Sequence, residues 1–184
     1  MTRAGFLVAL AAQFACLGCS NEEAPKAPPQ NLSAAAPSAA DFRITQRVTD
    51  QADLLDPAAE ARLTRVLADF ERRTAHQLVV VTVTSLDGRD VADYTRDLAN
   101  RSGIGRADQD DGVVLLVAPQ ERRMRIAVGI GLESVLTNEI CREIIESVLV
   151  PRFRQVDFAG GIEAGVAALI ARLDQAPGMS AAPR

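Results

Sequence analysis

Apolar positions along the chain follow two alternating patterns, which together predict an α/β domain over residues 44–174. Helical spacing begins behind Asp56-Pro57, where a capping carboxylate precedes proline at the first helical position. Short continuous apolar runs at 78–83 and 112–118 instead predict buried strands. The segment between these two strands returns to helical spacing behind Asp90, so a helix is expected to connect them.

The rest of the domain completes a mixed sheet. A turn over 119–123 leads into a third strand at 124–128, and Thr137 then begins a helix that is followed by a last apolar helix over about 162–173. Two strands joined by a helix favour a right-handed parallel crossover, whereas a short turn joins an antiparallel hairpin. We therefore expect a three-layer α/β/α sandwich with a small mixed sheet.

The N-terminus has the pattern of an export signal. Arg3 precedes a short apolar run that ends at Gly18-Cys19-Ser20, and the run is too short to span a bilayer. This ending resembles a bacterial lipobox, in which the cysteine thiol takes a diacylglycerol and becomes the mature N-terminus, although Cys16 replaces the usual branched apolar residue. Residues 1–19 are thus expected to be a lipoprotein signal peptide and Cys19 the lipidated residue; the alternative is an ordinary signal peptide.

Polar, proline-rich segments flank the domain. Residues 20–43 and 175–184 are rich in Ala, Pro and Ser, so they bury too little apolar surface to fold and are expected to be a disordered tether and tail. Such a tether reaches roughly 25 Å. The protein is therefore expected to face the periplasm, anchored to the membrane by its lipid, and Ser20 resembles the sorting pattern of the outer membrane.

Composition narrows the classes of function. The net charge is −4 and no basic face is evident, so a nucleic-acid partner is not expected. Of the three cysteines, only Cys141 remains once Cys16 leaves with the signal and Cys19 carries lipid, which excludes a disulfide framework. Cys141 lies on an apolar helical face and is interpreted as a core residue, and His76 is interpreted as a structural residue at a helix end.

Acidic residues gather in two loops that the hairpin should bring together. Because strands 112–118 and 124–128 are antiparallel, the loop before the first meets the loop after the second. The carboxylates of these loops are the predicted divalent-cation ligands, with calcium as the expected ion: Asp108, Asp110, Asp111 and Glu133. The alternative is that the aspartates are turn residues and the neighbouring glycines only permit the bends.

Signatures of established enzyme classes are sparse. The chain has no Gly-x-Ser-x-Gly elbow, no phosphate-binding Gly-x-x-x-x-Gly-Lys loop and no pair of histidines for zinc. Arg125 alternates with apolar residues on its strand, so it is interpreted either as a solvent-facing residue or as a contact for a phosphate or an acidic partner.

The joined pattern of these segments resembles the TPM-domain family. The resemblance is carried by Val48-Thr49-Asp50, Asp111-Gly112 with the apolar run behind it, Arg125-Ile126, and Val128-Gly129-Ile130-Gly131-Leu132-Glu133. It implies an α/β/α domain facing an extracytoplasmic space, a Ca²⁺ site and, for plant members, an acid phosphatase activity. The family's usual Asp-Asn-Gly is Asp110-Asp111-Gly112 here, and this second carboxylate favours a cation.

Three functions follow from these observations. The leading one is a membrane-tethered accessory module without catalysis, which binds a divalent cation and assists an unidentified membrane protein or complex. The second is a weak metal-dependent acid phosphatase in which Arg125 steadies the phosphate. The third is a structural envelope protein without a ligand.

Overall fold

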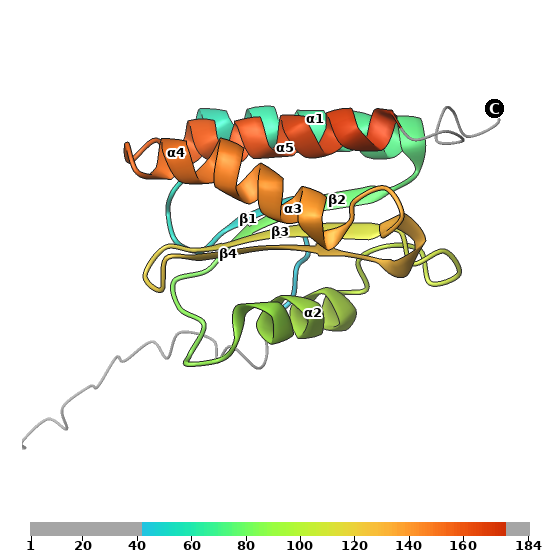
Figure 1. Ribbon diagram of the computed structural model, residues 1–184, viewed down its shortest axis with the longest axis horizontal. Coiled ribbons are helices and arrows are strands. Elements are labelled where there is room, and N and C mark those ends of the chain that lie inside the picture. The colour runs from blue at the N-terminus through green and yellow to red at the C-terminus, as the bar shows by residue number, and fades with distance from the viewer. Residues whose placement is uncertain (1–41, 176–184) are drawn as a thin grey trace, which may run out of the picture. The chain divides into compact units, whose positions relative to one another are not determined.

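A four-stranded mixed sheet forms the centre of the computed structural model, which describes residues 42–175 (Figure 1). The strand order is β1-β2-β3-β4, with β1, β2 and β3 parallel and β4 antiparallel to β3. The strands are β1 (Val48–Asp50), β2 (Gln77–Thr82), β3 (Gly112–Ala118) and β4 (Arg123–Val128). This arrangement confirms the predicted parallel crossover and antiparallel hairpin.

Helices cover both faces of the sheet, so the predicted three layers are confirmed. Helix α2 lies on one face, and helices α1, α3, α4 and α5 lie on the opposite face (Figure 1). The helical elements are α1 (Pro57–Thr74), α2 (Val91–Ser102), η1 (Ile130–Leu132), α3 (Asn138–Ile144), η2 (Ile145–Leu149), α4 (Val150–Phe153) and α5 (Phe158–Asp174). Asp56, Asp90 and Thr137 cap α1, α2 and α3 as predicted, each accepting a hydrogen bond from the first turn.

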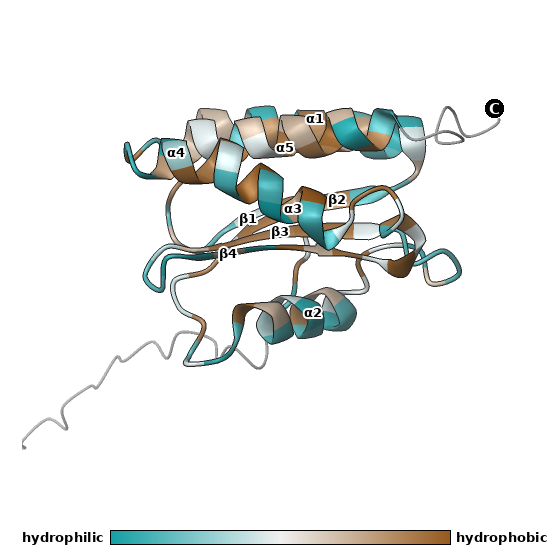
Figure 2. Cartoon of the chain, in the orientation of Figure 1, coloured by the Kyte–Doolittle hydropathy of each residue, from teal (hydrophilic) through white to brown (hydrophobic). Residues whose placement is uncertain are grey.

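The central strand β3 divides the core into two apolar layers. All seven of its residues are buried, since both faces of the strand are covered. Val113, Leu115 and Val117 pack in the cluster beneath α1 and α5, whereas Val114 and Leu116 pack in the cluster above α2. Figure 2 shows hydrophobic residues concentrated along the strands and on the helix sides that face them.

Two details of the chain path were not predicted. The short strand β1 escapes a pattern search because Val48 is its only buried apolar residue. The helix that starts after Thr137 is interrupted by the π-helical turn η2, which ends two residues before Pro151. Proline has no N–H to donate to the preceding turn, and the wider π turn accommodates this missing bond.

The turn after α4 holds a valine in a conformation that glycine prefers. Val156 has a φ of 62°, and its N–H donates to the Phe153 carbonyl while the Asp157 N–H donates to the Arg152 carbonyl. Left-handed backbone is costly for a β-branched residue. We expect Val156→Gly to raise the free energy of unfolding by about 1 kcal/mol, measured by chemical denaturation. The same exchange at the exposed helical Val66 is the control and should lower it by about 0.5 kcal/mol.

If Val156→Gly instead destabilised the protein as much as Val66→Gly does, the left-handed conformation would not be a source of strain in this turn.

Candidate functional site

Two glycine-containing loops meet at the amino end of the parallel strands. One loop enters β3 and the other leaves β4, and the hairpin register pairs Val113 with Val128 beside them. The Gly129 N–H donates to the Gly112 carbonyl at 2.8 Å, and the Gly131 N–H donates to the Asp110 carbonyl at 3.0 Å. The two loops are therefore joined through their backbones.

This contact leaves no room for side chains at two of the glycines. A Cβ atom at Gly129 would lie 2.0 Å from the Asp110 carbonyl oxygen, and one at Gly131 would lie 2.1 Å from the Gln109 carbonyl oxygen. Because the obstructing atoms are backbone, no side-chain rotation relieves the clash. The glycines thus serve close approach of the two loops.

Asp111, the residue just before β3, is buried beside this contact and is bound by two basic side chains. Its side chain is buried, with a relative exposure of 2%. The Arg106 backbone N–H donates to Oδ1 at 2.8 Å, and the Arg106 guanidinium donates to Oδ2 through Nε at 2.8 Å and Nη2 at 2.5 Å. His76 Nδ1 lies 2.9 Å from the same Oδ2. A carboxylate only accepts hydrogen bonds, so Nδ1 carries the proton in this contact.

These contacts keep Asp111 ionised. Burial alone would raise the pKa of its carboxyl, but the hydrogen bonds from Arg106 and His76 outweigh burial and lower that pKa. In return, the hydrogen bond to Asp111 raises the pKa of Arg106. The three side chains form one network, termed here the Asp111 network, whose negative charge is already paired.

Sequence reasoning missed the two basic members of the Asp111 network. The parallel register pairs Gln77 with Gly112, so the residues just before β2 and β3, His76 and Asp111, are neighbours. That alignment is a signal which the sequence carries once the crossover is assumed. No comparable signal identifies Arg106, which lies on the loop between α2 and β3.

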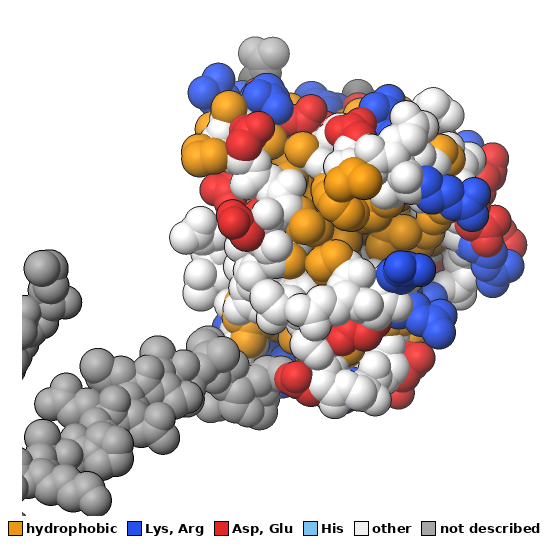
Figure 3. Space-filling model, turned by 90° about the vertical axis from the view of Figure 1, so that its left-hand side faces the viewer, with side chains coloured by type: hydrophobic (Ala, Val, Ile, Leu, Met, Phe, Trp, Pro, Cys, Tyr) orange, Lys and Arg blue, Asp and Glu red, His pale blue; other side chains and the backbone are white. Residues whose placement is uncertain are grey.

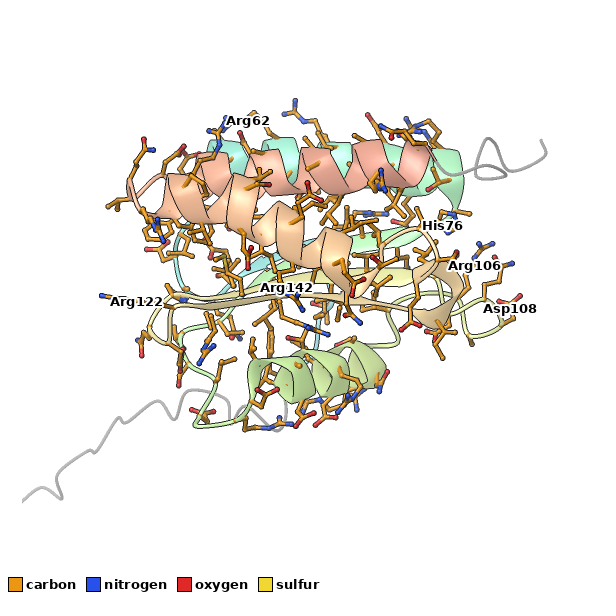
Figure 4. All side chains as sticks on the ribbon, viewed as in Figure 1. Arg62, His76, Arg106, Asp108, Arg122 and Arg142 are labelled. Carbon is orange, nitrogen blue, oxygen red and sulfur yellow. The ribbon has the colours of Figure 1, made fainter. Side chains whose placement is uncertain are left out.

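The other predicted metal ligands are divided between two places. Asp110 and Glu133 line one hollow of about 360 Å³, together with Arg96 and Asn100 of α2. The Asp110 carboxylate also accepts a hydrogen bond from the Ile130 N–H at 3.3 Å. Asp108 is exposed, and Figure 4 shows it at the outer end of the loop beyond Arg106.

The four predicted ligands therefore do not form a single cluster. Across residues 42–175, no three side chains of the types His, Cys, Asp and Glu come together closely enough to hold a metal ion. Asp110 and Glu133 share a solvent-open hollow, whereas Asp111 is held by the Asp111 network. A cation on this surface would rest on those two carboxylates with carbonyl or water oxygens completing its shell.

Arg125 and Cys141 lie away from that hollow. Arg125 is half-buried on β4 and borders a separate hollow of about 190 Å³, to which Glu133 also contributes. Cys141 is buried on α3, and burial raises the pKa of its thiol to about 11, which fits its interpretation as a core residue. Cys19, the signal peptide and most of the tether lie outside the described residues.

The fold and this site define a class: a three-layer α/β domain in which two glycine loops and a buried aspartate join at the amino end of the sheet. The chain matches the TPM domain over residues 48–172 and belongs to the TPM-domain family. No curated protein matches it significantly. Within residues 42–175, no helix combines the length and apolarity that crossing a bilayer demands.

Solved structures show the same architecture. The N-terminal domain of a protein from P. gingivalis is 31% identical, with a TM-score of 0.68, and the match covers 76% of this chain and 89% of that one. The N-terminal domain of a Corynebacterium glutamicum protein is 19% identical, covering 78% and 90%, with a TM-score of 0.57. The BA42 protein from Bizionia argentinensis is 20% identical, covering 68% and 85%, with a TM-score of 0.58. The last two similarities show only that this chain shares its fold with those domains.

Proposed function

We propose that this TPM domain is an extracytoplasmic accessory module, held at a membrane by lipid on Cys19, which binds a divalent cation and assists a membrane-protein complex. Calcium is the proposed cation, and Asp110 and Glu133 are its proposed side-chain ligands. The proposal is carried by one observation: these two carboxylates line the same open hollow beside the joined glycine loops.

The chemistry of the hollow suits weak calcium binding. Ca²⁺ takes oxygen ligands from carboxylates, backbone carbonyls and water, and extracellular modules with few charged ligands bind it with dissociation constants of about 0.1–1 mM. Arg96 at the border of the hollow lowers its negative charge and argues for the weak end of that range. A site of this strength would be filled by calcium outside the cytoplasm.

The Asp111 network argues against the phosphatase alternative as formulated from the sequence. That alternative needs Asp111 as a metal ligand, but Arg106 and His76 occupy its oxygens. It also needs Arg125 beside the metal; Arg125 shares the hollow of about 190 Å³ with Glu133 but does not line the hollow that holds Asp110. The accessory module loses Asp111 as a ligand too, but it needs only cation binding at Asp110 and Glu133 and no catalytic arrangement, so we favour it.

Calcium titration followed by thermal unfolding tests the cation site. With a dissociation constant of about 1 mM, Ca²⁺ at about 10 mM should stabilise the wild type by about 1.4 kcal/mol. The double variant Asp110→Asn with Glu133→Gln should lose this stabilisation, because both charged ligands become neutral.

Asp108→Asn is the matched control, since it removes one carboxylate from the same loop outside the hollow, and it should respond to Ca²⁺ as the wild type does. An equal response in the wild type and the double variant would place the effect of Ca²⁺ elsewhere and reject the site.

A further inference from the structure

The last strand of the sheet, β4, has an open edge. The hydrogen bond from the Gly129 N–H to the Gly112 carbonyl fixes which pairs of the ladder are hydrogen-bonded. By the alternation of an antiparallel ladder, the N–H and C=O groups of Arg123, Arg125 and Ala127 then point to β3. The N–H and C=O groups of Met124, Ile126 and Val128 point away from β3. Within residues 42–175, no fifth strand pairs with them.

Hollows follow this edge along its whole length on the side of α3. The largest, of about 560 Å³, lies between β4 and the helices; Met124, Ile126, Cys141 and Ile145 give it an apolar floor, and charged side chains of both signs, Arg125, Glu139, Arg142 and Glu146, also line it. A second, of about 500 Å³, lies at the hairpin end, and the hollow of about 190 Å³ lies at the other end beside Val128. Together they are termed the β4 groove.

The hairpin end of the β4 groove combines apolar and basic residues, with Arg122, Arg123 and Arg154 among those that line it. Phe153 and Phe158 line it and form an edge-to-face pair with ring centroids 5.1 Å apart. Both rings are only half-buried, and Val156 nearby in the chain is 73% exposed. Figure 3 shows apolar side chains gathered on this end of the molecule, bordered by both basic and acidic ones. Apolar side chains of a bound segment would be removed from water here.

The opposite side of β4 is basic. Arg123 and Arg125 alternate with the apolar residues, and their positive charges help to lower the pKa of Asp90, whose main cause is hydrogen bonding from the α2 backbone. Asp90 thus offsets part of this positive charge. Arg122, exposed at the turn, instead lines the hairpin-end hollow of the β4 groove.

These features select a partner strand of a particular chemistry. Successive side chains of an added strand point to opposite faces, so one set would enter the β4 groove and the other would meet Arg123 and Arg125. A second copy of β4 is disfavoured, because pairing two such strands brings like charges together. A segment that alternates apolar and acidic residues satisfies both sides.

We propose that the β4 edge binds an extended segment of a partner protein with alternating apolar and acidic residues, which adds to the sheet as a fifth strand. This inference rests on the proposed accessory function and names the chemistry of its partner. Main-chain hydrogen bonds to Met124, Ile126 and Val128 supply the affinity, and the β4 groove and the two arginines supply the specificity.

Binding of a synthetic octapeptide of alternating valine and glutamate to the full chain, purified in a mild nonionic detergent, tests this. Fluorescence anisotropy should detect binding below roughly 1 mM peptide. Two further peptides are N-methylated on alternate amides, one on the odd-numbered and one on the even-numbered residues. The peptide whose methylated amides face β4 should bind at least about tenfold more weakly, and the other should bind as the parent does. A lysine-for-glutamate peptide should bind at least about tenfold more weakly.

The matched protein variants are Arg123→Glu with Arg125→Glu against Arg65→Glu on the exposed side of α1. The double variant should weaken binding about tenfold, and Arg65→Glu should not change it. No binding at roughly 1 mM peptide, or equal binding of the two N-methylated peptides, would overturn the strand addition.

The calcium response of Asp110 and Glu133 is an independent readout of the proposed function. Crosslinking of a membrane partner to another face of the domain would leave the accessory function standing while the β4 proposal failed.

Discussion

Asp111→Ala is expected to lower the free energy of unfolding by about 3 kcal/mol. Removing one partner of a buried charged pair typically costs about 3–5 kcal/mol, and the part-exposed Arg106 guanidinium, which water can solvate, moves the expected loss to the low end. His76, which is mostly buried, would also lose its acceptor. Chemical denaturation of the wild type and the variant at neutral pH measures the difference.

The same pair of proteins should show a characteristic dependence on pH. The folded-state pKa of Asp111 is lowered, so its stabilisation is fully present above the unfolded value of about 3.9. It is lost as the pH falls through the folded-state pKa, because the protonated carboxyl no longer pairs with Arg106. The stability gap between wild type and Asp111→Ala should therefore narrow below about pH 4.

Asp108→Ala provides the control for this experiment, since it removes an exposed carboxylate from the same loop and should change stability by less than about 0.5 kcal/mol. A loss at Asp111 no larger than the loss at Asp108, or a gap that does not change with pH, would contradict the importance of the Asp111 network.

The hairpin made the meeting of the two loops predictable from the sequence. Once strands 112–118 and 124–128 were assigned to a hairpin, the loop before one and the loop after the other had to meet; the close backbone contact at Gly129 and Gly131 was not predicted. The layers of helices followed equally well from the apolar runs, because a strand buried on both faces needs helices on both.

The orientation of individual carboxylates was not predictable in the same way. The replacement of the family's asparagine by Asp111 favoured a cation, but the cation it meets is the Arg106 guanidinium of its own loop. Asp110 and Asp111 are adjacent, yet Asp110 adopts a left-handed backbone with a φ of 47° and lies in the outer hollow. The two adjacent carboxylates thus have different surroundings, which sequence spacing does not reveal.

Gly129→Ala is expected to lower the free energy of unfolding by about 3 kcal/mol, the other large effect at this end of the sheet. Gly129 has a φ of −70°, which any residue can adopt, so the cost comes from space alone. Its new Cβ would lie 2.0 Å from the Asp110 carbonyl oxygen, and overpacking against backbone costs about 1–3 kcal/mol or more. Chemical denaturation gives the loss of stability, and calcium titration shows whether the hollow survives.

Gly88→Ala separates this steric effect from the general cost of replacing a glycine. Gly88 has a φ of 74°, but a Cβ there would meet no atom within 4 Å, so only backbone strain of about 1 kcal/mol is expected. If Gly129→Ala proved as mild as Gly88→Ala, the two loops would be able to move apart without cost. The contact between the glycine loops would then not be what holds Asp110 and Glu133 at one hollow, as the proposed cation site requires. A large loss at Gly129 together with a lost calcium response would instead tie the site to the close approach of the two loops.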